Sequence, residues 1–282
     1  MKALKKAIQK PIFHSSHPHF RRFLRGISLL LILLLVVGCE SAPIERPAKP
    51  TDTSKKTDGI GNDIPTGTDP SKKRVALTFD DGPQHANDEE TKLIVDELGK
   101  YGFHATFFVV GNRIAGGDAL NYAVEHGNEI GIHGWSHNIY YDDCTDKEYW
   151  DELNKTHEKI TKRLPDYNVR LMRPIGGKIT AERLSSCPYS VIMWSVDSED
   201  WKNKSPAGDA DKINTIVENV MSNVSNGDII LMHDIYLNTY EATKIILQRL
   251  YDEGYEVVTV SELFGNDLQP AQKYYSTSGT IK

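Results

Sequence analysis

From residue 74 onward, two hydrophobic patterns take turns along the chain. Short apolar runs of strand length recur seven times, and each predicts a β-strand. The runs are Val75–Phe79, Ala105–Val110, Glu129–Ile132, Val169–Met172, Ser190–Val196, Ile229–Met232 and Glu256–Val260. Between them, apolar residues recur at helical spacing. The helical stretches are Glu89–Leu98, Lys147–Leu164, Lys212–Val224 and Tyr240–Glu253. A sequence of strands that are mostly followed by helices predicts an α/β fold with parallel strands.

The number of strand and helix units narrows this fold class. Seven units in one stretch suit a closed or nearly closed β/α barrel, and a doubly wound open sheet is the alternative. Thr145 and Glu148 have the spacing of a capping box in front of the second long helix. The chain contains no internal repeat, no G-x-G-x-x-G sequence and no Walker loop. We therefore expect one folded domain over about 74–265, followed by a C-terminal tail, 266–282.

The N-terminal part has a different pattern. Residues 1–26 carry seven Lys/Arg and no acidic residue, and Ile27–Val37 is apolar except for Ser28. This apolar run is shorter than the ~20 residues that span a bilayer, but it fits an export signal. The run ends in Val36-Val37-Gly38-Cys39, which resembles the lipobox of bacterial lipoproteins.

That resemblance implies a signal peptide over 1–38 and a lipid on Cys39, which would hold the protein at the outer surface of the cytoplasmic membrane. An uncleaved signal anchor is the alternative. Residues 39–73 are rich in Pro, Thr, Lys, Asp, Gly and Ser, a composition that favours a disordered tether. An N-terminal strand added to the domain is the other possibility.

Composition and charge exclude several classes of protein. The 282 residues are 39% hydrophobic and 26% charged, which is ordinary for a globular domain and excludes a multi-span membrane protein. The net charge is −6, and without the seven positive charges of residues 1–26 it is −13. An acidic body argues against nucleic acid as a partner. Cys144 and Cys187 could pair in an exported protein, or remain buried thiols.

Polar residues collect where the predicted strands end. In β/α barrels the chemistry lies at the C-terminal ends of the strands. Five predicted strands end in carboxylate, imidazole or guanidinium side chains. These ends are Asp80-Asp81-Gly82-Pro83, His133-Gly134-Trp135-Ser136-His137, Arg173-Pro174, Asp197-Ser198-Glu199-Asp200-Trp201 and His233-Asp234. The sequence therefore predicts one site on one rim of the barrel.

The residue types at this rim suit a divalent metal. One carboxylate and two imidazoles can bind such an ion and leave coordination positions open for water and substrate. Asp81, His133 and His137 can supply these three ligands. Asp80, next to a metal ligand, can then act as general base toward a water whose pKa the metal lowers. A charge-assisted bond from Arg173 would orient that base, although a plain salt bridge is the alternative.

Two further roles can be predicted for this rim. Amide hydrolysis must protonate the leaving amine, and His233 can supply the proton if Asp197 or Asp200 holds its imidazole. Trp135 and Trp201 could form an apolar wall for an acetyl methyl group or a sugar ring, or could simply pack at the rim.

These residues carry a resemblance to a known family. Thr78-Phe79-Asp80-Asp81-Gly82-Pro83 resembles the first motif of the polysaccharide deacetylases, carbohydrate esterase family 4, also called the NodB homology domain. Four later segments resemble its other motifs in the right order. They are His133 to His137, Arg173-Pro174-Ile175-Gly176-Gly177, Asp197 to Trp201, and Leu231-Met232-His233-Asp234. The resemblance covers about 75–265.

The family resemblance implies a distorted barrel of seven or eight β/α units and one divalent ion, Zn²⁺ first, with Co²⁺, Ni²⁺ or Mn²⁺ as alternatives. It implies that Asp81, His133 and His137 bind the metal. By position, the catalytic groups are Asp80 as base, Arg173 as its orienting partner and His233 as acid tuned by Asp200. The substrate contacts include Leu231 and the backbone N–H of Gly176, which faces the oxyanion.

Two of the motifs depart from the family pattern. Gly134 stands where Ser or Thr usually follows the first histidine, so a side-chain hydrogen bond that stiffens the metal loop is missing. Ile175 and Gly176 replace a second proline and an aromatic residue, which leaves the choice of substrate open.

The resemblance implies deacetylation of acetylated sugars. With a lipid anchor, N-acetylglucosamine units of peptidoglycan are the expected substrate of a monomeric enzyme, and chitin oligosaccharides, an exopolysaccharide or acetylated xylan remain open. A carbohydrate-binding lipoprotein without activity, or a solute-capture lipoprotein, is the alternative from another class.

Overall fold

The computed structural model describes residues 72–279 with gaps at 85–88, 115–116, 139–143 and 206–207. The predicted signal peptide, Cys39 and most of the tether lie outside the described residues. Among the described residues, no helix is both long enough and apolar enough to cross a bilayer.

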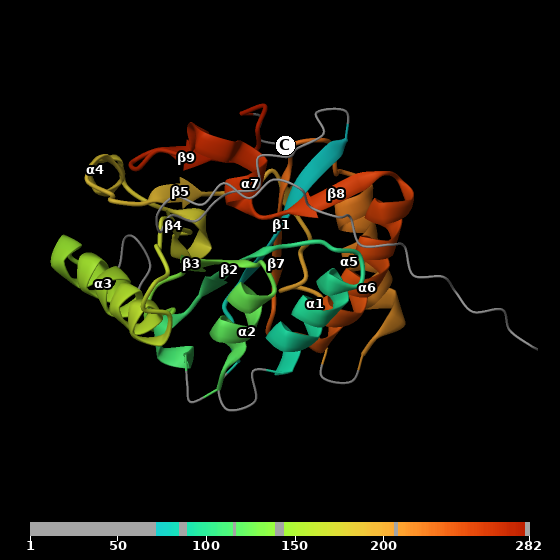
Figure 1. The fold of residues 1–282 in the computed structure, drawn as a ribbon, viewed down its shortest axis with the longest axis horizontal. Helices are drawn as coiled ribbons and strands as arrows, with labels where there is room; N and C mark the ends of the chain where they lie inside the picture. The colour runs from blue at the N-terminus through green and yellow to red at the C-terminus, as the bar shows by residue number, and fades with distance from the viewer. Residues whose placement is uncertain (1–71, 85–88, 115–116, 139–143, 206–207, 280–282) are drawn as a thin grey trace, which may run out of the picture. The chain divides into compact units, whose positions relative to one another are not determined.

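Nine strands of the described chain form one parallel sheet that curls into an incomplete barrel (Figure 1). Its strands are β1 (Lys73–Asp80), β2 (Thr106–Val109), β3 (Glu129–Ile132), β4 (Leu171–Met172), β5 (Ser190–Ile192), β6 (Val196–Asp197), β7 (Ile229–His233), β8 (Tyr255–Val258) and β9 (Lys273–Tyr274). The order across the sheet is β6-β7-β1-β2-β3-β4-β5-β9, and β8 pairs with the first half of β1. The predicted distorted (β/α) barrel is confirmed.

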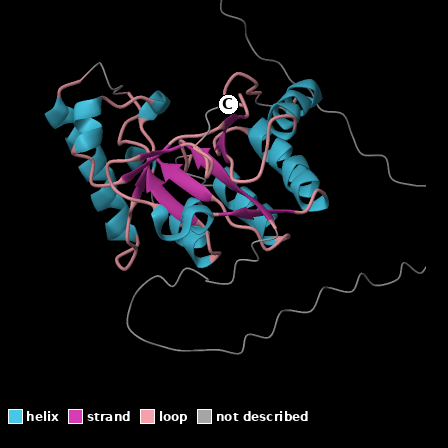
Figure 2. Ribbon diagram, turned by 90° about the horizontal axis from the view of Figure 1, so that it is seen from above, coloured by secondary structure: helices cyan, strands magenta, loops and turns pink. Residues whose placement is uncertain are grey.

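The helices lie around the outside of the strands (Figure 2). They are α1 (Glu89–Gly99), α2 (Ala119–Glu125), α3 (Asp146–Arg163), α4 (Ala181–Ser185), α5 (Ala210–Met221), α6 (Leu237–Asp252) and α7 (Val260–Phe264). Three short 3-10 turns accompany them: η2 (Gly111–Arg113), η3 (Ile175–Gly177) and η4 (Gly265–Asp267). Helix α3 begins with the predicted capping box, in which Thr145 and Glu148 bond each other's backbone N–H.

The two-residue period of β1 explains how a polar site forms inside an apolar fold. Alternate residues of a strand point to opposite faces of the sheet. Val75, Leu77 and Phe79 belong to the large core cluster that includes the apolar faces of the helices. Ala76 belongs to a second cluster, with residues of β2, β4, β5 and β7. Asp80 lies four residues further on and therefore faces the same interior as Ala76.

The structure corrects the strand predicted over Ser190–Val196. Two strands occupy this segment: β5 pairs with β4, and β6 pairs with β7. Between them, the N–H of Met193 bonds Tyr274 and that of Ser195 bonds Ile229. The segment therefore crosses from one side of the curled sheet to the other. Because it stays buried almost throughout, its apolar pattern carries no sign of the change of partner.

The sheet also extends past the domain boundary predicted at residue 265. Strand β9 pairs in parallel with β5, and the N–H of Thr277 bonds the carbonyl of Gly227. The segment that was expected to be a tail is thus part of the fold. The hydrophobic pattern gave little indication of this strand, because β9 has only two residues, one of them exposed and one half-buried.

Candidate active site

The C-terminal ends of the strands surround a cleft of about 440 Å³. Its lining combines carboxylate, imidazole, aromatic and glycine residues from β1, β3, β6, β7 and the adjoining loops. The lining residues are Asp80, Asp81, His133, His137, Gly176, Gly177, Trp194, Asp197, Trp201, Leu231, His233 and Tyr236. Ten of these twelve residues belong to the strand ends and motif segments identified in the sequence, and they lie together in one cleft.

Asp81, His133 and His137 form a candidate metal site. Their ligand atoms lie within 4.8 Å of one another. Oδ1 of Asp81 is 3.0 Å from Nε2 of His137 and 3.7 Å from Nε2 of His133. Ligands that each lie about 2.0–2.2 Å from one ion are roughly 3–4 Å apart. The three side chains therefore have the spacing of one coordination sphere.

The hydrogen bonds of this group favour metal binding. Nδ1 of His133 donates to the carbonyl of Arg173 at 2.8 Å, which leaves the Nε2 lone pair directed toward Asp81. Burial lowers the pKa of His133, so the imidazole is neutral, as a ligand must be. Oδ1 of Asp81 is buried and accepts no hydrogen bond. A cation between these atoms would satisfy it, so the residues present fit a divalent metal.

Asp81 is ionised in spite of its burial. Burial alone would raise the pKa of this carboxyl, but His137, His133 and the more distant His233 lower it well below its usual value. Its backbone has φ of +81°, a conformation that costs free energy for a non-glycine residue. Arg113 restrains this conformation, because its guanidinium donates to the Asp81 carbonyl at 2.7 Å.

Asp80 forms a buried ion pair with Arg173. Nη1 of Arg173 is 2.8 Å from Oδ1 of Asp80 and also donates to Thr78. Nε and Nη2 donate to the carbonyls of Ile192 and Met193, where the chain leaves β5. Arg173 is fully buried. It therefore orients Asp80 and satisfies the backbone where the barrel closes.

His233 is held by Asp200 and not by Asp197, which resolves the alternative left open by the sequence. Nδ1 of His233 lies 2.7 Å from Oδ1 of Asp200. Asp200 also accepts from the N–H of His233 and from the hydroxyl of Thr239. Burial would lower the pKa of His233, but Asp200 outweighs it and raises the pKa to about 9. Asp197 instead accepts from the N–H of Glu199.

The residues predicted to contact substrate divide into two groups. Gly176, Trp201 and Leu231 line the cleft, and Trp201 is 45% exposed. Trp135 is not among the described residues of the lining, because its ring lies against Gly111. This contact agrees with rim packing, the alternative stated for Trp135.

Two aromatic residues of the cleft, Trp194 and Tyr236, were not predicted from the sequence. Trp194 lies in the segment between β5 and β6, and Tyr236 precedes α6. Neither belongs to a quoted motif, and the position of Tyr236 three residues after His233 was the only available signal. Cys144 and Cys187 are not joined by a disulfide.

Comparison with known proteins decides the family. The family model described as "Polysaccharide deacetylase" matches residues 67–190. A peptidoglycan-N-acetylglucosamine deacetylase of Bacillus cereus is 33% identical over 205 residues, which cover 68% of this chain and 89% of that protein. The chain belongs to the polysaccharide deacetylase family. Proteins of this family use a divalent metal, and the Asp81–His133–His137 group is the possible site for it here.

Two further relatives give more detail. The peptidoglycan-N-acetylmuramic acid deacetylase PdaC of Bacillus subtilis is 40% identical over 196 residues, or 69% of this chain. The chain spans only about two fifths (39%) of the length of PdaC. A solved structure of PdaC superposes with a TM-score of 0.62, covering 70% of this chain and 92% of the solved one.

A solved family 4 acetyl xylan esterase from Clostridium thermocellum, in complex with a cobalt ion, has a TM-score of 0.64 and 29% identity. The superposition covers 73% of this chain and 99% of that structure. The relatives therefore share the curled barrel of this chain, although their names differ in the sugar on which they act.

Proposed function

We propose that this protein is a metal-dependent hydrolase that removes acetyl groups from N-acetylated sugars of a polysaccharide. The observation that supports this most strongly is that three potential metal ligands line one cleft together with Asp80 and His233. Behind the cleft, Arg173 binds Asp80 and Asp200 binds His233. Zn²⁺ is the proposed ion, with Co²⁺, Ni²⁺ or Mn²⁺ as alternatives. The ion, when bound, would polarise the amide carbonyl and lower the pKa of a water molecule.

In the proposed reaction, Asp80 takes a proton from the attacking water. Its Oδ1 is occupied by Arg173 at 2.8 Å, so Oδ2 is the oxygen that can accept the proton. Oδ2 lies 3.7 Å from Nε2 of His133, which places it beside the ligand group. Arg173 keeps the carboxylate in this orientation while the water oxygen bonds to the acetyl carbon.

His233 then donates a proton to the sugar nitrogen. With Nδ1 bound to Asp200, Nε2 is the nitrogen that faces the cleft, and a pKa of about 9 keeps the imidazole protonated at neutral pH. As the C–N bond breaks, the nitrogen receives this proton, and the products are acetate and a free amine. The N–H of Gly176 would stabilise the oxyanion, a contribution that can be worth about 3 kcal/mol.

For the substrate, we propose N-acetylglucosamine units of peptidoglycan. The names of two relatives support a peptidoglycan substrate, one through N-acetylglucosamine and one through N-acetylmuramic acid. Chitin oligosaccharides, an exopolysaccharide and acetylated xylan are the other candidates. Trp201 and Tyr236 provide aromatic faces in the cleft that suit the apolar face of a sugar ring.

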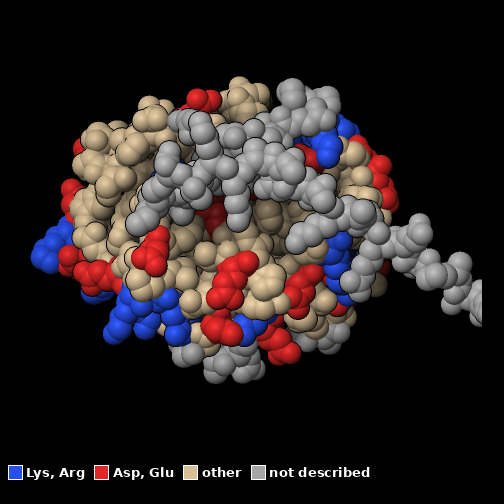
Figure 3. Space-filling model, viewed as in Figure 1, with Lys and Arg blue, Asp and Glu red and all other residues tan. Residues whose placement is uncertain are grey.

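For the location, we propose a monomer on the outer face of the cytoplasmic membrane, anchored by lipid on Cys39. Nucleic acid is not a proposed partner, because the chain after residue 26 has a net charge of −13. On the face shown in Figure 3, basic residues lie in separate groups among acidic ones. Incorporation of a labelled fatty acid in cells, lost in Cys39→Ser, tests the anchor. Incorporation that persists in Cys39→Ser would reject it.

The reaction is tested by acetate release from the purified protein. Peptidoglycan, chitooligosaccharides and acetylated xylan serve as separate substrates, each with chelator, with re-added Zn²⁺ and with the Asp80→Asn variant. Release that stops with chelator, returns with metal and is absent in Asp80→Asn supports the proposal. Sugar binding without acetate release from any substrate would favour a binding protein instead.

A further inference from the structure

The loop that carries both histidine ligands has an unfavourable backbone. His137 has φ of +56°; Gly134, with φ of +81°, adopts this region without strain because it has no Cβ. A non-glycine residue in this region costs on the order of 1–3 kcal/mol and persists only where the surroundings restrain it. The position of His137 relative to Asp81 therefore depends on contacts from outside the loop.

The carbonyl groups of this loop are bound by two other elements. Backbone N–H groups of η2 donate to it, from Gly111 to Gly134 at 3.0 Å and from Asn112 to Trp135 at 2.9 Å. From α3, the Thr156 hydroxyl donates to the Gly134 carbonyl at 2.8 Å. These contacts hold the first half of the loop, next to His133.

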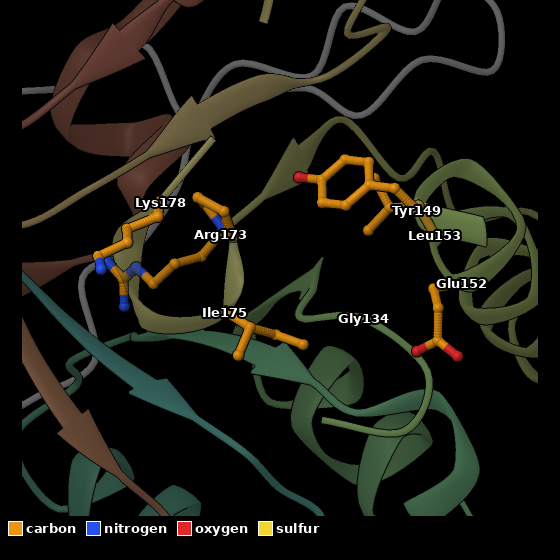
Figure 4. A pocket seen from close by; sticks show the side chains of 8 residues that line it. Gly134, Tyr149, Glu152, Leu153, Arg173, Ile175 and Lys178 are labelled. Carbon is orange, nitrogen blue, oxygen red and sulfur yellow. The ribbon is translucent and has the colours of Figure 1, made fainter. Parts of the chain in front are cut away.

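The second half of the loop depends on Glu152. One oxygen of its carboxylate, Oε2, accepts from the N–H of Trp135 at 2.9 Å and from the N–H and hydroxyl of Ser136 at 2.8 and 3.1 Å. Figure 4 shows the Glu152 carboxylate pointing from α3 toward the loop that follows Gly134. These three hydrogen bonds end one residue before His137.

The space beside Gly134 is not completely filled. Gly134 has no side chain, and a Cβ there would lie 2.9 Å from Cδ1 of Ile175. Beside it is a cavity of about 10 Å³, lined by Gly134, Tyr149, Glu152 and Ile175 among others (Figure 4), room for about one water molecule. The loop could relax into this space if its bonds to Glu152, which also lines the cavity, were lost.

We propose that Glu152 is a positioning residue for the metal: it fixes the loop so that His137 stays in ligand range of Asp81. Gly134 has no side chain that could form a hydrogen bond within the loop. Glu152 forms such bonds from α3 instead. The inference rests on the proposed function only in requiring that the site bind a divalent metal, and not on any particular substrate.

The test is the affinity of the metal-free full chain for Co²⁺, measured by calorimetry and by the visible spectrum of the bound ion. Four variants are compared: Glu152→Ala, Glu152→Asp, Glu152→Gln and, as a matched control, Glu158→Gln. Glu158 is an exposed acid on the same helix, six residues after Glu152. Thermal unfolding in chelator is recorded for each, because a role in folding alone would move this midpoint and not the affinity of the folded protein.

The three substitutions at Glu152 separate position from charge. Asp keeps the charge but withdraws the carboxylate by one carbon–carbon bond, roughly 1.5 Å. Gln keeps an acceptor oxygen in place without the charge. We expect Glu152→Ala and Glu152→Asp to weaken Co²⁺ binding by about 10–100-fold, the range typical of groups that orient metal ligands, and to change the spectrum. Glu152→Gln and Glu158→Gln should remain close to wild type.

Several results would overturn the inference. Equal affinity in all variants would show that the loop needs no support from Glu152. Weak binding by Glu152→Gln with normal binding by Glu152→Asp would show that charge, and not position, matters. If Glu152→Ala fails to fold, the comparison of Co²⁺ affinity between Glu152→Asp and Glu152→Gln is sufficient to test the inference. A wild-type protein that binds no Co²⁺ refutes the inference together with the metal site, whereas one that binds Co²⁺ but releases no acetate refutes only the proposed function.

Discussion

Replacing Asp234 by Asn should make the protein more stable at alkaline pH, although it removes a motif carboxylate. Asp234 is buried beside the loop that follows β1. Its Oδ1 accepts from the N–H of Gly82 at 2.9 Å, and its Oδ2 accepts from the hydroxyl of Thr91 at 2.5 Å. An Asn can keep both bonds, because its amide oxygen can accept from Gly82 and its NH₂ can donate to the threonine oxygen.

The magnitude follows from the pKa of Asp234. Burial, with a smaller effect of Asp81, raises it from 3.8 to about 7. Between these two values the folded state holds a proton that the unfolded state has lost, so the free energy of unfolding falls as pH rises through this window. From pH 5 to pH 8 this group alone should remove about 2–3 kcal/mol of stability from the wild type. Asp234→Asn has no such group and should not lose this amount.

Urea unfolding of both proteins at pH 5 and pH 8, in chelator, measures the effect. All other groups titrate alike in the two proteins, so the change with pH in the difference between them isolates Asp234. We expect Asp234→Asn to gain about 2–3 kcal/mol on the wild type between pH 5 and pH 8. Asp234→Ala is the control: it breaks both bonds and should be less stable than Asp234→Asn at both pH values. A difference that does not change with pH, or that moves against Asp234→Asn as pH rises, would refute the reasoning.

Three more predictions follow from the site and its supports. Asp200→Asn should lower the pKa of His233, because the charge of Asp200 then no longer outweighs the effect of burial. The alkaline limb of the pH profile of kcat/KM should therefore move to lower pH. A limb that does not move would contradict the role of His233 as acid. Arg173→Met should cost about 3–5 kcal/mol in urea unfolding by leaving Asp80 buried without its partner; if the pair matters, the cost should shrink in an Asp80→Asn background. Thr145→Ala removes the cap of α3 and should lower the free energy of unfolding by about 1 kcal/mol. Acetate release should stay unchanged. An unchanged midpoint of urea unfolding would show that the cap does not stabilise the protein.

Much of the site could be predicted because it lies at strand ends. The alternation along β1 sets the face on which Asp80 lies, and parallel strands bring their C-terminal ends to one rim. The choice between Asp197 and Asp200 could not be made from sequence, because both lie in one short segment. The structure decides it through a backbone that places Asp200, and not Asp197, against the imidazole of His233.

Predictions from the sequence were wrong where a buried segment changes its strand partner or its direction. Trp135 follows the first histidine, but its ring lies against Gly111 instead of the cleft, in a loop whose positive φ values no apolar pattern reveals. The segment 190–196 is apolar almost throughout, because it is buried both where it pairs with β4 and where it approaches β7. Strand β9 is too short to produce a period. In each case a tertiary contact, and not a local preference, determines the structure.

Three residues hold the candidate site in place: Arg173, Glu152 and Asp234. They differ in whether a substitution would affect the site alone or also the stability of the fold. Arg173 orients Asp80 and also binds the carbonyls of Ile192 and Met193 where the barrel closes, so a loss of activity on its removal could not be assigned to the proposed base alone. Glu152 and Asp234 each bind a ligand-bearing loop from one side and leave the strand ladders intact. Substitutions at these two residues therefore test how the loops are held, while Arg173 links the closure of the fold to the chemistry.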